Sequence, residues 1–262
     1  MAVGHNVEMP FLDHLEELRW RLVWSLIALA VGVAVGFWVV TQFDVLLLLE
    51  QPIVRFLPAG KHLVYTHPAD PFHITITASF AIGVVLALPV ILYQLWAFLA
   101  PALYSHEKRV VLPVLFAGAL LFMIGALLCF KFILPVTLQF LTGIQATGLD
   151  PMITANDYFG FAISMCLATG AVFELPIVIL LLTALRIVTP RLLKKFRRHA
   201  VVLTLVVAAF ITPGQDPLSL MSLAVPLYFL YELSIGASSL VFRRRMRREA
   251  EAAQPDEAGA TA

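Results

Sequence analysis

A series of long apolar runs, separated by short polar stretches, constrains this chain most. Four of the runs, at about 22–43, 72–99, 110–133 and 158–185, exceed 20 residues. A hydrocarbon core about 30 Å thick takes roughly 20 helical residues, and only helices or closed barrels satisfy their backbone groups in lipid. The chain is 60% hydrophobic and 13% charged, against about 45–50% and 25% in soluble domains. We predict an all-α integral membrane protein.

The last two apolar runs are less regular. Residues 200–211 form a stretch of 12 residues, which as a helix would reach only about 18 Å. The next run, 218–242, is interrupted by Pro226 and Glu232. We predict that both runs span, with bilayer thinning or shielding by protein at the shorter one. The six predicted spans are about 22–43, 72–99, 110–133, 158–185, 200–212 and 218–242.

Local patterns predict features outside and within these spans. Residues 1–21 are predicted to hold a cytoplasmic amphipathic helix, and the Pro-containing segment 44–71 to be a polar capping loop. From Arg243 the chain is basic, then acidic and Ala-rich, so residues 243–262 are predicted to be disordered. The first span contains Gly32-x-x-x-Gly36, a spacing that favours close helix contact, either within one chain or between two copies.

Lys and Arg residues are distributed unevenly between the two sides of the predicted bundle. The N-terminal segment, the 103–109 turn, the 186–198 segment and the C-terminal tail together hold 15 of the 18. The alternate loops hold only Arg55 and Lys61, and Lys131 is placed at the outer end of a span, where it can snorkel. Because loops rich in Lys and Arg stay in the cytoplasm, both termini are predicted to be cytoplasmic.

The segment just before the first span is amphipathic. At about 100° of rotation per residue, one narrow face is formed by the apolar side chains Phe11, Leu15, Leu18 and Leu22. Glu17 and Arg21 are spaced for an i,i+4 ion pair, worth a few tenths of a kcal/mol on a solvated helix. The alternative interpretation is that acidic side chains are held near the lipid headgroups for a binding role.

Glu107 lies in a short cytoplasmic turn between the second and third predicted spans. Taken alone, it is typical of a carboxylate that stabilises the start of the following helix. Because the turn is short, Glu107 should stay near the bilayer surface, as should Glu16 and Glu17. If the two segments are adjacent, they form an acidic patch suited to a pair of guanidinium groups, since Arg makes bidentate hydrogen bonds that Lys cannot.

Glu174 is the most costly residue to place in the predicted membrane domain. A carboxylate near the bilayer centre costs about 2.5 kcal/mol or more on insertion scales and faces protein or a water-filled cavity. Pro176 frees a backbone carbonyl one turn earlier, which is typical of a broken helix that lines a cavity. Two interpretations stay open: a neutral Glu bonded to a neighbouring helix, or a functional group in a groove.

Sequence motifs of enzymes are absent. The chain contains no G-x-S-x-G, H-E-x-x-H, Walker or dinucleotide-binding pattern. The 7 His residues all fall in predicted loops or at span ends, so an intramembrane metal site is not expected. Cys129 and Cys166 lie within apolar runs, where they act as small hydrophobic residues. We therefore predict no catalysed covalent reaction, no cofactor and no metal.

Taken together, these motifs make the sequence similar to the TatC family, the multispanning subunit of the twin-arginine protein translocase. The similarity covers about residues 9–242 in order, and the Pro89–Tyr104 string is its most specific part. The matching motifs are His14-Leu-Glu-Glu-Leu-Arg-Trp-Arg-Leu22, Pro89-Val-Ile-Leu-Tyr-Gln-Leu-Trp-Ala-Phe-Leu-Ala-Pro-Ala-Leu-Tyr104, His106-Glu107, Phe173-Glu-Leu-Pro176, and Thr212-Pro213 with Asp216.

The resemblance implies a fold and two sets of site residues. The fold is a glove-shaped, concave arrangement of six transmembrane helices, of which the fifth and sixth are short. In the signal-peptide-binding set, Glu17 and Glu107 would receive the two arginines of the signal; its other members are Arg19, Phe98, Leu99, Pro101 and Tyr104. In the groove or translocation set, Glu174 would project into the concave face; its other members are Asp216 and Pro52.

The resemblance also implies a function and partners. The protein would be the receptor and core subunit of a Sec-independent translocase in the cytoplasmic (inner) membrane of a bacterium, driven by proton-motive force. It would bind the Arg-Arg signal peptides of folded cargo proteins, contact membrane lipid, and assemble as an oligomer with TatA-like and TatB-like single-span subunits. No nucleic acid is expected. The alternative is a proton-coupled secondary transporter using Glu174, which would predict inverted repeats; we see no such pairing between the halves.

Overall fold

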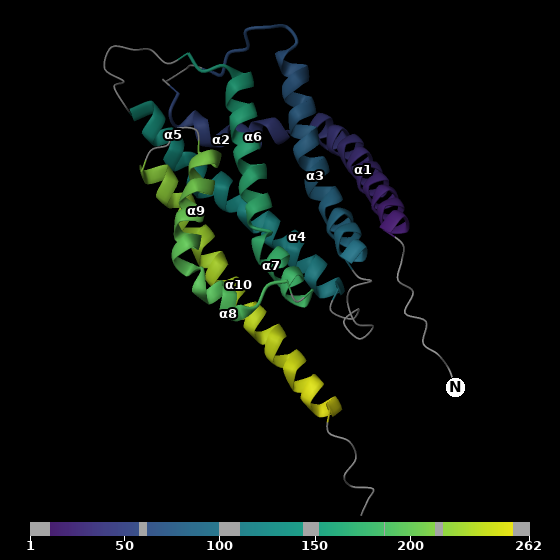
Figure 1. Ribbon diagram of the computed structural model, residues 1–262. Coiled ribbons are helices and arrows are strands. Elements are labelled where there is room, and N and C mark those ends of the chain that lie inside the picture. Colours follow the sequence, from purple (N-terminus) through teal and green to yellow (C-terminus); the bar gives the residue numbers. More distant parts are fainter. Residues whose placement is uncertain are drawn as a thin grey trace, which may run out of the picture.

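The structure is a computed structural model that describes residues 11–57, 62–99, 111–143, 152–185, 187–212 and 217–253. Within these ranges the regular secondary structure is helical, joined by turns and short irregular segments, and an isolated bridge links Val64 to Thr154. The helices are α1 Phe11–Gln42, α2 Val45–Val54, α3 Asp70–Leu99, α4 Val111–Leu128, α5 Leu134–Gly143, α6 Ala155–Val172, α7 Leu175–Ala184, α8 Pro190–Lys195, α9 Arg197–Ile211 and α10 Pro217–Ala253 (Figure 1). The all-α prediction is confirmed.

Five helical segments among the described residues are long and apolar enough to cross a membrane. They are Asp13–Gln42, Asp70–Phe98, Pro113–Gly143, Ala155–Ala184 and Pro217–Arg243, and each overlaps one of the predicted spans. The remaining predicted span coincides with α9, whose 15 residues fall short of the roughly 20 that an ordinary span needs. The fifth helix is therefore short, as the resemblance implied. The sixth is not, because α10 runs for 37 residues.

Two other segments differ from the sequence-based prediction. Helix α2 lies within 44–71, which was predicted to be a polar loop; it is apolar, and its Pro52 and Ile53 are buried. It is too short to span a bilayer, but it buries one face against the core. Helix α10 continues to Ala253, so the predicted disorder from Arg243 is wrong over these residues. Arg, Glu and Ala are good helix formers, and extending an existing helix needs no new nucleus.

Proline accounts for the irregular turns inside two of the spans. Pro135 has no N–H to donate to the carbonyl of Lys131, so the helix loses one backbone hydrogen bond at this point and is strained there. The turn before it, Cys129–Ile133, is π-helical, and the Leu134 N–H bonds back to the Cys129 carbonyl. Pro176 likewise deprives the Val172 carbonyl of its partner, and α6 ends at Val172 before α7 begins at Leu175.

Helices α1 and α3 pack antiparallel along most of their length, and Figure 1 shows them side by side at one edge of the bundle. Glycines bring their backbones together. A Cβ atom built on Gly32 would lie 2.6 Å from the Gly83 carbonyl oxygen, and one on Gly36 would meet the Ser79 carbonyl. The Gly32-x-x-x-Gly36 face therefore packs within the chain, and this register places the start of α1 beside the end of α3.

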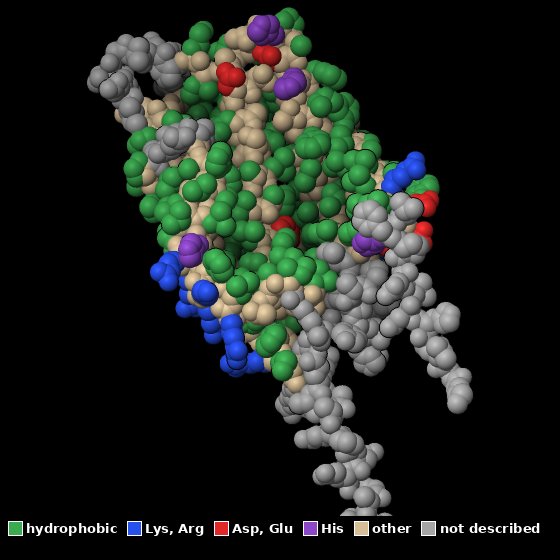
Figure 2. Space-filling view, in the orientation of Figure 1, with side chains coloured by type: hydrophobic (Ala, Val, Ile, Leu, Met, Phe, Trp, Pro, Cys, Tyr) green, Lys and Arg blue, Asp and Glu red, His purple; other side chains and the backbone are tan. Residues whose placement is uncertain are grey.

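The rest of the bundle packs against α10 and α6. Helix α10 contacts α7 and α9, while α6 contacts α3 and α4. Helix α2 lies across the long helices at the end away from the start of α1 (Figure 1). Figure 2 shows hydrophobic side chains over the middle of the visible face, and Lys and Arg side chains at the end formed by α8 and neighbouring parts of α9 and α10. Among the described side chains of these helices, the exposed cations are Arg191, Lys194, Lys195, Arg197, Arg198 and Arg243.

Candidate functional site

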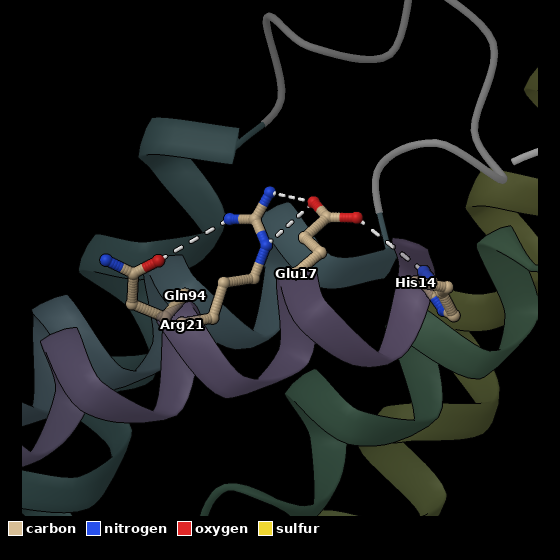
Figure 3. Close-up of polar contacts among 4 residues, drawn as sticks. All are labelled: His14, Glu17, Arg21 and Gln94. Atoms are coloured by element: carbon tan, nitrogen blue, oxygen red, sulfur yellow. Dashed lines mark hydrogen bonds and ion pairs between the residues drawn. The ribbon is translucent and has the colours of Figure 1, made fainter. Parts of the chain in front are cut away.

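The first candidate site lies where the start of α1 meets the end of α3. Glu17 and Arg21 are one turn apart on α1, and Gln94 reaches them from α3 (Figure 3). The Arg21 Nε donates to Glu17 Oε1 at 2.9 Å, and Arg21 Nη2 contacts the same oxygen. Arg21 Nη1 donates to Gln94 Oε1 at 3.4 Å. The i,i+4 pair predicted from the sequence is present, and it is extended to a second helix.

The other oxygen of Glu17 is buried beside His14. Glu17 Oε2 is buried and has no hydrogen-bond partner among the described residues, and the His14 Nδ1 lies 3.6 Å from it. The His14 ring stacks on Phe98 of α3, with centroids 4.3 Å apart and planes 13° apart. Glu17 and Phe98, which the resemblance placed in one set, thus both contact His14.

Of the other predicted members of the signal-binding set, only Arg19 has a side chain among the described residues. Arg19 is exposed on α1. Leu99 is the last residue of α3, and its side chain is outside the described residues. Glu107, Pro101 and Tyr104 also fall outside the described residues.

The second candidate site is the carboxyl group of Glu174, at the junction of α6 and α7. The residue is 7% exposed, and neither carboxyl oxygen has a hydrogen-bond partner among the described residues. A Cβ atom built on Gly118 of α4 would lie 3.0 Å from Glu174 Oε2 and 2.6 Å from a methyl carbon of Leu92. The resemblance implied projection into a concave face; here the carboxyl lies against α4, beside Leu92 of α3.

Glycines of α4 and α6 make room for the break that carries Glu174. The Phe173 N–H bonds back to Thr169 and Gly170, and the Glu174 N–H to Ala171. A side chain at Gly125 would meet the Phe173 ring, and one at Gly170 would meet the Phe122 ring. Apolar residues pack tightly around the carboxyl group, which is the costly arrangement expected for an intramembrane carboxylate.

Pro52 is buried in α2, away from Glu174 in the sequence and on a different helix. Asp216 falls outside the described residues. No group of three or more His, Cys, Asp or Glu side chains that could hold a metal occurs in the part of the chain that the structure describes.

Comparison with known proteins identifies the family. Residues 13–226 match the family described as "TatC: Sec-independent protein translocase protein (TatC)". The chain belongs to the TatC family. It is 40% identical over 239 residues to the Sec-independent protein translocase protein TatC of Aquifex aeolicus, covering 90% of this chain and 98% of that protein. It is 36% identical over 242 residues to TatC of Escherichia coli K12, covering 92% of each.

Solved structures of TatC share the fold. The crystal structure of the twin-arginine translocase receptor TatC is 39% identical, with a TM-score of 0.72, and covers 87% of this chain and 98% of its own. A second structure, of TatC in the detergent DDM, is 38% identical with a TM-score of 0.74, covering 86% and 99%. A TatC-family protein with this helical fold is an integral membrane protein, and its family is one of protein translocases, which supports a non-enzymatic role.

Two contacts at the α1–α3 end were not predicted from the sequence. Gln94 lies inside the Pro89–Tyr104 string of the TatC motif, and His14 opens the first motif, but neither was assigned a contact. The signal that could have found them is the hairpin itself: two successive spans are antiparallel, so the start of the first must approach the end of the second. The contact between Gly118 and Glu174 could not be predicted in this way, because it depends on the position of the α6–α7 break.

Proposed function

We propose that this TatC-family protein is the receptor and core subunit of a twin-arginine translocase. It binds the Arg-Arg signal peptide of folded cargo proteins and nucleates the translocation complex. The protein lies in the cytoplasmic membrane of a bacterium with both termini in the cytoplasm, and translocation is driven by proton-motive force. The six-span fold is glove-shaped, with Glu174, Asp216 and Pro52 serving translocation.

The observation that carries this proposal is the guanidinium already held by Glu17. The carboxylate receives Arg21 through two N–H groups, and His14, whose ring stacks on Phe98, lies 3.6 Å from its other oxygen. This end of α1 therefore has the charge and the geometry for a forked cation. An Arg of a signal peptide offers the same fork, whereas a Lys offers a point charge that makes no planar bidentate contact.

Several features support the orientation and the assembly. The start of α1 and the end of α10 lie toward the same end of the bundle (Figure 1), where the exposed cations of α8 and α9 also gather (Figure 2), as the positive-inside rule requires of a cytoplasmic face. The short α9 leaves a thin part of the bundle for a TatB-like single-span subunit, with a TatA-like subunit recruited nearby. A single copy of this size has no room to pass a folded protein, so assembly into an oligomer is required.

The test is binding of a synthetic signal peptide to the detergent-purified protein. The Arg-Arg peptide, about 15–30 residues long, is compared with its Lys-Lys twin. We expect tighter binding of the Arg-Arg form, because two guanidinium forks are lost in the twin. Glu17→Gln and Glu107→Gln should each abolish the preference, because a neutral amide accepts weaker hydrogen bonds and leaves the signal's charge unpaired.

Asp13→Asn is the matched control. Asp13 is exposed on α1, one turn before Glu17, so its substitution removes the same charge from the same helix. The preference for Arg-Arg should survive in Asp13→Asn. Equal binding of the two peptides by the wild type would contradict the receptor function. If Asp13→Asn loses the preference together with Glu17→Gln and Glu107→Gln, the preference reflects the general negative charge of this end of the protein and not a specific site.

A further inference from the structure

The Glu17 carboxylate is closed to an incoming cation in this structure. Its Oε1 is occupied by two N–H groups of Arg21. Its Oε2 is buried, has no hydrogen-bond partner among the described residues, and lies 3.6 Å from His14 Nδ1, with which it makes an ion-pair contact when the imidazole is protonated. A guanidinium that arrives from outside therefore cannot bind Glu17 unless Arg21 first leaves.

The contacts of Arg21 allow its guanidinium to dissociate from Glu17. Its side chain is 24% exposed, and that of Glu17 is 22% exposed. Its third contact, with Gln94, is a single hydrogen bond of 3.4 Å, near the long limit for such bonds. The long flexible stem of Arg allows the guanidinium to swing toward the headgroup region without movement of the helix.

We propose that Arg21 is an internal stand-in for an arginine of the signal peptide, that it occupies Glu17 in the empty receptor, and that Gln94 positions it there. This inference rests on the proposed function, in which Glu17 receives an arginine of the signal. Signal binding is then an exchange of one guanidinium for another. The exchange conserves the hydrogen bonds to Glu17 when the ligand is Arg but loses the fork when the ligand is Lys.

The stand-in has a defined effect on affinity. An apparent dissociation constant equals the intrinsic constant divided by the fraction of receptor whose site is open. A partly exposed ion pair contributes about 0.2–1 kcal/mol, so removing it should tighten binding by about 1.4-fold to 5-fold. Because an internal competitor weakens every ligand by the same factor, the affinity for the Arg-Arg and Lys-Lys peptides should rise together and their ratio should stay constant.

The experiment compares peptide binding to the wild type, Arg21→Gln and Gln94→Ala, all as full-length protein in detergent. Arg21→Gln removes the stand-in and should tighten binding of both peptides by the same factor, within the range above. Gln94→Ala keeps the charge of Arg21 but removes the hydrogen bond that joins Arg21 to α3. It should tighten binding of both peptides by a smaller factor than Arg21→Gln does. If Arg21→Gln does not fold, Gln94→Ala carries the test alone.

Arg191→Gln controls for net charge. Arg191 is exposed on α8, remote from Glu17 in the sequence, and its loss removes the same single positive charge. It should leave both affinities unchanged. Equal tightening in Arg191→Gln and Arg21→Gln would overturn the inference in favour of general electrostatic attraction.

The outcomes separate this inference from the proposed function. Weaker or unchanged binding by Arg21→Gln, with the wild type still preferring Arg-Arg, would overturn only the stand-in role and would make Arg21 a structural or supporting residue. No preference in the wild type would overturn the receptor function, and the inference with it. A changed ratio of the two affinities in Arg21→Gln would show that Arg21 contacts the bound ligand instead of competing with it.

Discussion

Replacing Gly32 with Ala should force α1 away from α3, because the absent side chain lets the two backbones meet. A Cβ atom built on Gly32 lies 2.6 Å from the Gly83 carbonyl oxygen and 3.2 Å from the Gly83 carbonyl carbon. These are backbone atoms of a helix, so no change of rotamer relieves the contact. Ordinary van der Waals contact begins at 3.4 Å, so the helices must separate by about 0.8 Å at this point.

The size of the effect follows from two opposing contributions. Overpacking a close contact costs about 1–3 kcal/mol, while Ala is favoured over Gly inside a helix by about 1 kcal/mol. Gly236 of α10 has no neighbouring atom within 4 Å of a built Cβ, so Gly236→Ala should show the favourable contribution alone. The difference in stability between the two variants isolates the contact and should be about 1–3 kcal/mol.

The assay is the apparent melting temperature of each variant purified in detergent. One kcal/mol corresponds to about 2–4 °C for a chain of roughly this size, so Gly32→Ala should melt about 2–12 °C below Gly236→Ala. Gly36→Ala, which meets the Ser79 carbonyl, should behave like Gly32→Ala. Equal melting of Gly32→Ala and Gly236→Ala would refute the reasoning that backbone contact holds α1 against α3.

Two further predictions concern Glu174 and Tyr158. Glu174→Gln should keep signal-peptide binding, because the residue lies at the α6–α7 break and not at the α1–α3 end. The same substitution should alter export of a reporter protein that carries a twin-arginine signal. Unchanged export would mean that Glu174 has only a structural role. Tyr158→Phe removes the hydrogen bond of 2.7 Å from the Tyr158 hydroxyl to the Leu49 carbonyl, which joins α6 to α2, and should lower stability by about 1 kcal/mol. Tyr65→Phe, at an exposed residue, is the control for the measurement of melting temperature. Equal melting temperatures of Tyr158→Phe and Tyr65→Phe would exclude a stabilising role of the Tyr158–Leu49 hydrogen bond.

The spans were predictable because length and hydropathy decide them. Each of the five candidate spans follows an apolar run, and the short α9 follows the short run at 200–211. Helix α2 was missed because its apolar residues precede Glu50, Gln51 and Pro52, so the whole segment appeared polar and proline-broken. Helix α10 was predicted to end too early because charge was taken as a sign of disorder, whereas an attached helix continues through good helix formers.

The candidate site was only partly predictable, because its contacts depend on register. The Glu17–Arg21 pair follows from i,i+4 spacing within one helix. The contacts of Gln94 and Phe98 with α1 require the offset between α1 and α3, which the backbone contacts at Gly32 and Gly83 set. Hydropathy gives the order of the spans but not this offset, since every residue on an apolar face fits lipid or protein equally well.

The two carboxylates lie in opposite environments, and this contrast divides their roles. Glu17 is partly exposed and already balanced by a guanidinium, so an external guanidinium can replace the internal one without a net loss of hydrogen bonds. Glu174 is nearly buried, unpaired among the described residues and packed against Gly118 and Leu92. Glu174 therefore offers an external cation much less surface than Glu17 does. We therefore expect selection of the signal's arginines at the α1–α3 end, and a contribution of Glu174 only in steps that rearrange the helices around it.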